Sequence, residues 1–317
     1  AIVRTDAKVD LFIDPLKLTS AVREHLGPTV QLFPPERLGP ALEALGTEGA
    51  KIMIDPSGAN EWIRLRLKAS GAEIISAEDP CILPRALKNE TEIAGTIAAH
   101  NRDGAALSRF LRWLDENAPG VSELDCVETL AGFRAAMKNY RGDSFNTIAG
   151  SGPNGAIVHY RVTEKTDRTL GEGELFLVDS GGQYLDGTTD VTRTIAIGEP
   201  TDEMRRAFTL VLKGHISLAT ARFPAGTKGG QLDALARQHL WRHGLNYDHG
   251  TGHGVGLEIH ESPRIGPVSD TLKAGMVVTV EPGLYYADSG GMRIEDMVVV
   301  RKGGCEVLTT APKVLEI

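Results

Sequence analysis

The sequence predicts an α+β catalytic domain preceded by a small α/β domain, and three observations indicate this division. Short apolar strands alternate with helical spacings over residues 1–86. Pro84 and the motif KNETEIA (residues 88–94) then begin a different pattern, in which two helices precede a strand-rich half. This order is typical of helices packed on a largely antiparallel sheet. A chain of 317 residues, 41% of them apolar, also fits two domains better than one.

The first domain, residues 1–86, alternates between the two-residue period of strands and the spacing of helices. The strand-like segments are VDLFID, VQLFP, AKIMIDP and AEIISAED (residues 9–14, 30–34, 50–56 and 72–79). Helical spacing is found in PLKLTSAVREHLG, ERLGPALEALG and GANEWIRLRLKASG (residues 15–27, 36–46 and 58–71). Several of these helices close on glycine, which is a stop signal. We therefore expect a small α/β layer.

The second domain, residues 87–317, is expected to begin with a capped helix. Asn89 is a candidate N-cap, and Glu92 completes an arrangement like a capping box. A long helix should follow to about Glu116, and a second helix is expected over residues 122–139. The expected strands are GAIVHY, ELFLVDSG, TTDVTRTIAIG, GMVVTVEPG and MRIEDMVVV (residues 155–160, 174–181, 188–198, 275–283 and 292–300), with amphipathic helices near 202–222 and 229–243.

Charge and composition exclude several classes of protein. With 34 Lys+Arg against 42 Asp+Glu, the chain lacks the positive surplus of a nucleic-acid binder, so small or peptidic substrates are the expected partners. No apolar run is long enough to span a bilayer, and no membrane partner is expected. The widely spaced Cys81, Cys126 and Cys305 favour a reducing, cytoplasmic setting. Because the chain opens on Ala1 without an initiator Met, we expect a processed product or a fragment.

Residues 249–261, HGTGHGVGLEIHE, hold three of the nine histidines of the chain, with four glycines between them. Each glycine would destabilise a helix by roughly 1 kcal/mol, so the segment is expected to be extended. In a regular strand His249 and His253 share one face, and the glycines share the other, where another element can approach closely. The two histidines would then lie about 13 Å apart, too far to bind one ion. One is therefore a candidate metal ligand and the other a candidate substrate contact.

Four carboxylates end or interrupt segments that otherwise consist of apolar strand residues. Asp179 ends LFLVD, and Asp190 follows across a turn signal, Asp186-Gly187. The two aspartates would be roughly 36 Å apart in a fully extended chain, so only a chain reversal can bring them together. Glu281 closes MVVTV, and Glu295 interrupts RIEDMVVV.

Ionised carboxylates in buried strands are unfavourable unless they are paired or bind a cation. The set therefore predicts two divalent ions with bridging carboxylates, His253 as a nitrogen ligand and a metal-bound hydroxide as the nucleophile. The alternative is that these acids are solvated or pair with Arg193 and Arg293. That explanation fits any one carboxylate well and the set poorly.

Five motifs resemble, in order and spacing, the catalytic domain of aminopeptidase P (Xaa-Pro aminopeptidase), a family of pita-bread-fold metallopeptidases. They are GSGPNGAIVHY, DSGGQYLDGTTDVTRT, HGTGHGVG, VEPGLY and RIED. The resemblance covers residues 87–317 and implies a pita-bread catalytic domain. It is nearest to the cytosolic three-domain form, whose middle, creatinase-N-terminal-like domain resembles residues 1–86. The family's first domain is expected to be missing, and the middle domain is expected to be partial.

The resemblance implies a role for each candidate residue. Two divalent metal ions per chain, usually Mn²⁺, are implied to be held by Asp179, Asp190, His253, Glu281 and Glu295. His159, His249 and His260 are implied to line the substrate site, with Arg293 beside the metal cluster. In catalysis Glu281 is expected to hold a proton and pass it to the leaving nitrogen, while His249 and His260 donate hydrogen bonds to the substrate. A homodimer is also implied.

The implied activity is the metal-dependent release of the first residue from peptides with proline in second position (Xaa-Pro-Yaa). Prolidase has the same fold and cuts only Xaa-Pro dipeptides, so longer peptides would discriminate the two. Creatinase-like relatives work without metal, and some pita-bread proteins only bind their ligands. All five ligand types are present here, which argues against both of these readings.

Overall fold

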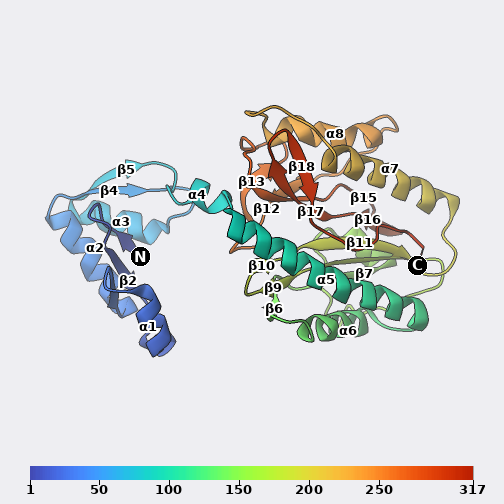
Figure 1. Cartoon of the computed structure of the whole chain (residues 1–317), viewed down its shortest axis with the longest axis horizontal. Coiled ribbons are helices and arrows are strands. Elements are labelled where there is room, and N and C mark those ends of the chain that lie inside the picture. The colour runs from blue at the N-terminus through green and yellow to red at the C-terminus, as the bar shows by residue number, and fades with distance from the viewer. Residues whose placement is uncertain (317) are drawn as a thin grey trace. The chain divides into compact units, whose positions relative to one another are not determined.

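The computed structural model describes residues 1–316 and contains two compact units, Ala1–Cys81 (unit 1) and Ile82–Ile317 (unit 2). Figure 1 shows the helices and strands of both units. Unit 1 is an α/β layer and unit 2 is α+β, as the sequence predicts.

Unit 1 consists of two small sheets and three α-helices. The first sheet has the order β1-β2-β3 and the second pairs β4 with β5. The strands are β1 (Ile2–Val3), β2 (Val9–Phe12), β3 (Val30–Phe33), β4 (Lys51–Ile54) and β5 (Glu73–Ser76). The helices are α1 (Ser20–Leu26), α2 (Leu38–Thr47) and α3 (Glu61–Ser70), with 3-10 turns η1 (Pro15–Lys17) and η2 (Pro35–Arg37). Strands β2 and β3 run parallel, as do β4 and β5, because a helix returns the chain between them.

Four of the five α-helices described in unit 2 form two pairs, with strands between them (Figure 1). They are α4 (Ile82–Ala86), α5 (Glu90–Asn117), α6 (Glu123–Ala135), α7 (Asp202–Ala219) and α8 (Gly229–Trp241). Helix α5 packs on α6, and α7 packs on α8. The predicted capping box at the start of α5 is confirmed, because Asn89 accepts from the Glu92 backbone and the Glu92 side chain accepts from the Asn89 backbone.

Unit 2 has four sheets, and all of their strand pairs are antiparallel. Their orders are β10-β9-β6, β11-β8-β7, β13-β12-β14-β17-β18 and β15-β16. The first strands are β6 (Tyr140–Asp143), β7 (Ile148–Ser151), β8 (Leu175–Ser180), β9 (Gly182–Tyr184), β10 (Gly187–Thr188) and β11 (Val191–Ala196). The remaining strands are β12 (Gly252–Gly254), β13 (Glu261–Ile265), β14 (Val277–Val280), β15 (Gly283–Tyr286), β16 (Gly290–Arg293), β17 (Asp296–Arg301) and β18 (Gly304–Val307).

Apolar side chains between the helix pairs and the sheets form the core of unit 2. Phe110 and Leu114 of α5 pack with Phe176 of β8 and Ile195 of β11 on one side. On the other side Val211 of α7 belongs to a second apolar cluster that also contains residues of β8, β11 and β16. Strands β8 and β11 are thus covered on both faces, and polar groups on them are buried.

Within residues 1–316, no helix combines the length and apolar character needed to cross a bilayer.

Three of the predicted strands are wrong in extent or kind. The segment GAIVHY is not a strand, because its first residues belong to a 3-10 helix, η3 (Gly152–Ala156), and successive turns follow to Tyr160. MRIEDMVVV is divided between β16 and β17, since the chain passes from one sheet to another at Ile294 and Glu295. The extended segment expected from His249 contains only the three-residue strand β12.

Candidate metal centre

Asp179 and Asp190 are brought together by the chain reversal that the sequence predicts. Asp179 lies in β8, and Asp190 immediately precedes β11. Strands β9 and β10 form the intervening hairpin, in which Tyr184 pairs with Gly187 across the two turn residues. Val191 then pairs with Ser180, so the two aspartates flank the start of the β8–β11 ladder.

The other three candidate ligands come from neighbouring strands of the five-stranded sheet. His253 lies in β12, Glu281 follows β14, and Glu295 precedes β17. Strand β14 lies between β12 and β17, so strand order alone places these three side chains in one region. A bridge between Thr192 of β11 and Glu295 joins this region to the strands that carry the aspartates.

The side chains of this set converge. Ligand atoms of Asp190, His253 and Glu295 all lie within 4.8 Å of one another. His253 Nε2 is 3.5 Å from Asp190 Oδ2 and 3.6 Å from Glu281 Oε1. Asp179 lies close enough to Asp190 for its charge to raise the pKa of that residue, and it accepts a hydrogen bond from Arg293 Nη2 at 2.7 Å.

The electrostatics of this cluster are unfavourable without a cation. Burial and the neighbouring carboxylates Asp179 and Glu281 raise the pKa of Asp190 well above its ordinary value. The pKa of Glu295 is raised in the same way by burial and by Asp190. Burial raises the pKa of Glu281 to about 7, although Arg293 opposes the shift. Carboxylic acids that resist ionisation in a buried cluster are typical of sites that bind positive charge.

Two buried carboxylate oxygen atoms of this cluster also lack partners among residues 1–316. Asp179 Oδ1 and Asp190 Oδ1 accept no hydrogen bond. Such atoms are rare in folded proteins and require an explanation. Divalent cations would satisfy both oxygens and stabilise the four carboxylates, so the residues present fit the two metal ions that the sequence predicts.

The three remaining histidines lie around this cluster and differ in their contacts. The ring centroid of His260 is 4.4 Å from that of His253, and burial lowers the pKa of His260. His249 hydrogen-bonds through Nδ1 to Gly250 O at 2.7 Å and through Nε2 to Tyr285 Oη at 2.9 Å. Burial lowers its pKa to about 4, so the ring is neutral near pH 7. His159 is exposed, and its charged form would lower the pKa of Glu281, His249 and His260.

The sequence analysis missed the hydroxyl groups that connect these residues. Tyr285 accepts from Arg293 Nη1 at 2.7 Å and contacts His249, so one hydroxyl joins the arginine to the histidine. Thr192 donates to Glu295 Oε2 at 2.7 Å. Only their position in the sequence could have indicated these hydroxyl groups. Tyr285 belongs to VEPGLY and Thr192 to DVTRT, close to the charged residues of each motif.

The glycines of residues 249–261 have the purpose that the sequence suggests. A Cβ on Gly252 would lie 2.1 Å from the backbone oxygen of Thr279, and one on Gly254 would lie 2.2 Å from that of Ser262. The expected regular strand is nevertheless wrong, because a register shift follows His253 and the His249 carbonyl accepts from Arg237 of α8. The 13 Å separation assumed a regular strand and does not carry over.

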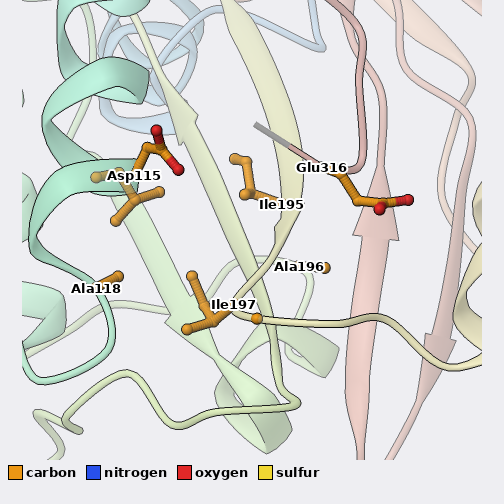
Figure 2. A pocket seen from close by; sticks show the side chains of 8 residues that line it. Asp115, Ala118, Ile195, Ala196, Ile197 and Glu316 are labelled. Carbon is orange, nitrogen blue, oxygen red and sulfur yellow. The ribbon is translucent and has the colours of Figure 1, made fainter.

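A separate hollow of about 200 Å³ lies between the end of α5, the end of β11 and Glu316 (Figure 2). Its lining residues are Leu114, Asp115, Ala118, Ile195, Ala196, Ile197, Gly198 and Glu316. None of them is a predicted site residue. Asp115 and Glu316 are acidic, but no cluster of metal-binding side chains is found there among residues 1–316.

Two family models together cover most of the chain. The model of metallopeptidase family M24 matches residues 94–302, and that of the creatinase/prolidase N-terminal domain matches residues 1–92. The chain belongs to metallopeptidase family M24.

Curated relatives are named probable Xaa-Pro aminopeptidase P. The protein from Coccidioides posadasii (strain C735) is 43% identical over 94% of this chain and 48% of its own length. That from Aspergillus niger is 41% identical over 97% of this chain and 55% of its own length. The chain thus spans about half the length of the curated relatives it matches.

Solved structures of two named activities are similar to this M24 chain. One is the X-prolyl aminopeptidase of Caenorhabditis elegans, described as a cytosolic enzyme with a di-nuclear active site. It is 34% identical with a TM-score of 0.88, covering 96% of this chain and 54% of that one. A Xaa-Pro dipeptidase from Bacillus anthracis is 30% identical with a TM-score of 0.80, covering 91% of this chain and 81% of that one.

Proposed function

We propose that this chain is the catalytic part of a metal-dependent aminopeptidase that releases the first residue from Xaa-Pro-Yaa peptides. The observation that carries the proposal is the buried convergence of Asp190, His253 and Glu295, with Glu281 and Asp179 beside them. The names of the curated relatives support the substrate class.

The five residues of this cluster would hold two divalent cations. Four of the five are carboxylates, and hard oxygen donors of this kind suit Mn²⁺. The di-nuclear site named for the C. elegans enzyme supports the number of ions. When bound, such ions polarise a scissile carbonyl and lower the pKa of water.

The chain's own residues would bind the peptide and move one proton. Glu281 would accept a proton and return it to the departing nitrogen. The free α-amine of a peptide would bind near Asp179, whose Oδ2 accepts from Arg293. Among residues 1–316, no hydrogen bond is formed by the ring nitrogens of His260, whereas His249 must release Tyr285 or Gly250 before it contacts a substrate.

Prolidase activity is the second candidate. The similarity to the B. anthracis Xaa-Pro dipeptidase, which is 30% identical with a TM-score of 0.80, supports it. A protein that only binds peptides is disfavoured, because all five ligand types are present. We further propose a cytoplasmic location, which the cysteine pattern and the cytosolic C. elegans relative support, and a homodimer, as the family resemblance implies.

The test combines elemental analysis with four peptides. We expect two divalent ions per chain, with cleavage of Arg-Pro-Pro and little of Arg-Ala-Pro. N-acetylated Arg-Pro-Pro should not be cleaved, because the free amine is lost. Cleavage confined to Ala-Pro would identify a prolidase. Equal cleavage of the alanine and proline tripeptides would remove proline specificity from the proposal.

A further inference from the structure

Glu123 is a buried carboxylate outside the metal centre that the proposed chemistry does not use. It is the first residue of α6, and its exposed fraction is 0%. Among residues 1–316 it forms no ion pair. The helix N-terminus favours its negative charge, but a carboxylate this deeply buried also needs donors.

Most of the donors to the Glu123 carboxylate come from one segment, Ser151 to Tyr160, and the Arg168 backbone donates to Oε2 at 3.3 Å. The Ser151 backbone donates to Oε1 at 2.7 Å, and Asn154 Nδ2 donates to both carboxylate oxygens at 2.9 and 3.1 Å. Tyr160 Oη lies 2.9 Å from Oε2 and 2.9 Å from the Thr166 carbonyl, so its one hydrogen is directed to either acceptor. Glu123 therefore contacts the beginning, middle and end of this segment.

The same segment is held on its other side by the metal centre. Arg293 Nη2 donates to the Val158 carbonyl at 3.5 Å, the limit of a hydrogen bond. A Cβ on Gly291 would lie 2.0 Å from the Gly155 carbonyl oxygen, so the backbones of this segment and of β16 are in close contact. His159 lies between Val158, which contacts Arg293, and Tyr160, which contacts Glu123.

We propose that Glu123 is a positioning residue for His159. Hydrogen bonds to Glu123 of α6 hold the loop of residues 152–160 on one side, and contacts with β16 hold it on the side of the metal centre. The exposed imidazole of His159 is therefore kept at a defined position. The inference rests on the proposed function only in taking His159 as a substrate contact. Because the loop has no strand partner over residues 152–160, its conformation depends on these side-chain bonds.

The kinetic test is a double-mutant cycle on the full metal-loaded chain, with Arg-Pro-Pro as substrate. We expect Glu123→Ala to lower kcat/KM by about 10- to 100-fold, as a displaced contact does, with metal content unchanged. In a His159→Ala background the same change should lower it by less than about twofold, because the contact is already lost. Glu128→Gln, an exposed position on the same helix, is the matched control. Independent, multiplying losses would overturn the proposal.

A second readout does not depend on activity. In Glu123→Gln and in Tyr160→Phe, which remove fewer bonds, hydrogen exchange over residues 152–160 should rise by about tenfold or more while β8 stays protected. The imidazole signal of His159, assigned by its loss in His159→Ala, should shift in both variants. Unchanged exchange and an unchanged signal would overturn the proposal. Inactivity of the unmodified chain toward Arg-Pro-Pro would instead contradict the proposed function and leave this readout decisive.

Discussion

At the scale of single residues, the candidate ligands and the candidate substrate contacts should separate by what their loss removes. We expect Asp190→Ala and His253→Ala to lower metal content and turnover together, because both side chains face the ligand cluster. His249→Ala and His260→Ala should keep the metal and lose turnover. Elemental analysis beside kinetics checks this, and equal metal loss in all four variants would contradict the division of roles.

Protonation of the same cluster predicts how metal affinity depends on pH. The pKa of Glu281 is raised to about 7 by burial, so this carboxyl is largely protonated at pH 6. Metal binding must displace that proton, and affinity should therefore rise from pH 6 to pH 8 and level off above. Calorimetric titration with Mn²⁺ at pH 6 and pH 8 measures this affinity. Glu281→Gln should bind Mn²⁺ more weakly, and its affinity should change less with pH. An unaltered pH dependence of the affinity would mean that Glu281 is not a metal ligand.

Residues with unusual chemistry for their surroundings were predictable from the sequence. Asp179 and Glu295 stand out because a charge in an apolar strand has few explanations. Tyr285 and Glu123 were missed for the opposite reason. A tyrosine in a half-buried strand and a glutamate in the first turn of a helix are both ordinary, and only the fold reveals that each connects distant segments.

At the scale of elements, the close approach of β12 to its neighbour can be tested by one methyl group. Gly252→Ala would place a Cβ 2.1 Å from the Thr279 backbone oxygen, which must move. We expect a loss of about 1–3 kcal/mol in the free energy of unfolding, as for other overpacked sites. Gly132→Ala, in α6 with open space around it, should instead gain about 0.5–1 kcal/mol. Urea unfolding of both variants measures these changes. An unchanged free energy of unfolding in Gly252→Ala would contradict the close contact between Gly252 and Thr279.

The loop that carries His260 is held by a buried ion pair. Lys88 Nζ lies 2.9 Å from Glu261 Oε2, and the two side chains are 7% and 1% exposed. Lys88→Met leaves the carboxylate buried, with the more distant Arg85 at 3.6 Å and the Glu258 backbone N–H at 3.1 Å, and should destabilise the chain by about 3 kcal/mol.

Two controls belong to this prediction. Replacing both partners (Lys88→Met with Glu261→Met) should destabilise less than Lys88→Met alone, because no unpaired charge remains. Arg112→Ala removes an exposed pair with Glu116 and should change stability by less than about 1 kcal/mol. If the double variant were the least stable of the three, the ion-pair explanation would fail.

Helices were predicted better than strands, and the reason is local. The capping box of α5 is encoded within four residues, and glycine ends α1 and α3. The GAIVHY segment has the composition of a strand, yet its backbone turns. Glu123, far earlier in the chain, accepts from Asn154 just before the segment and from Tyr160 at its end. The break in MRIEDMVVV likewise depends on which sheets lie on either side of Glu295.

At the scale of the whole molecule, buried charges join the sheets of unit 2. Arg193 of β11 donates to the carbonyls of Glu295 and Ala311 and to Asp296 Oδ1. Asp296 also accepts from Lys313 Nζ at 2.7 Å and lies 3.3 Å from His215 Nε2 of α7. One carboxylate thus connects β11, β17, α7 and the C-terminal segment beside the metal centre. Nothing in the sequence marks Asp296 apart from its neighbour Glu295, so this division of roles needed the fold.

This connection predicts an acid-sensitive stability. Burial lowers the pKa of His215 to about 4, below the ordinary value of about 6.5 for an unfolded histidine. Unfolding therefore takes up a proton between these two pH values, and the stability due to neutral His215 is complete above pH 6.5 and lost as pH falls toward 4. Asp296 acts in the same direction, because Arg193, His215 and Lys313 lower its pKa against the effect of burial.

The free energy of unfolding decreases between pH 6.5 and pH 4, and we expect this decrease to be smaller in His215→Gln. The difference should be about 3 kcal/mol at most, which is the free energy that the shift in the pKa of His215 represents. The measurement is the urea midpoint of the metal-free chain across this window. It is compared between variants at each pH, because the carboxylates of the metal centre, with raised pKa values, titrate in the opposite direction. His25→Gln, at an exposed position of unit 1, should leave the curve unchanged. A His215→Gln curve parallel to that of the unmodified chain would mean that His215 is already protonated beside Asp296 at neutral pH.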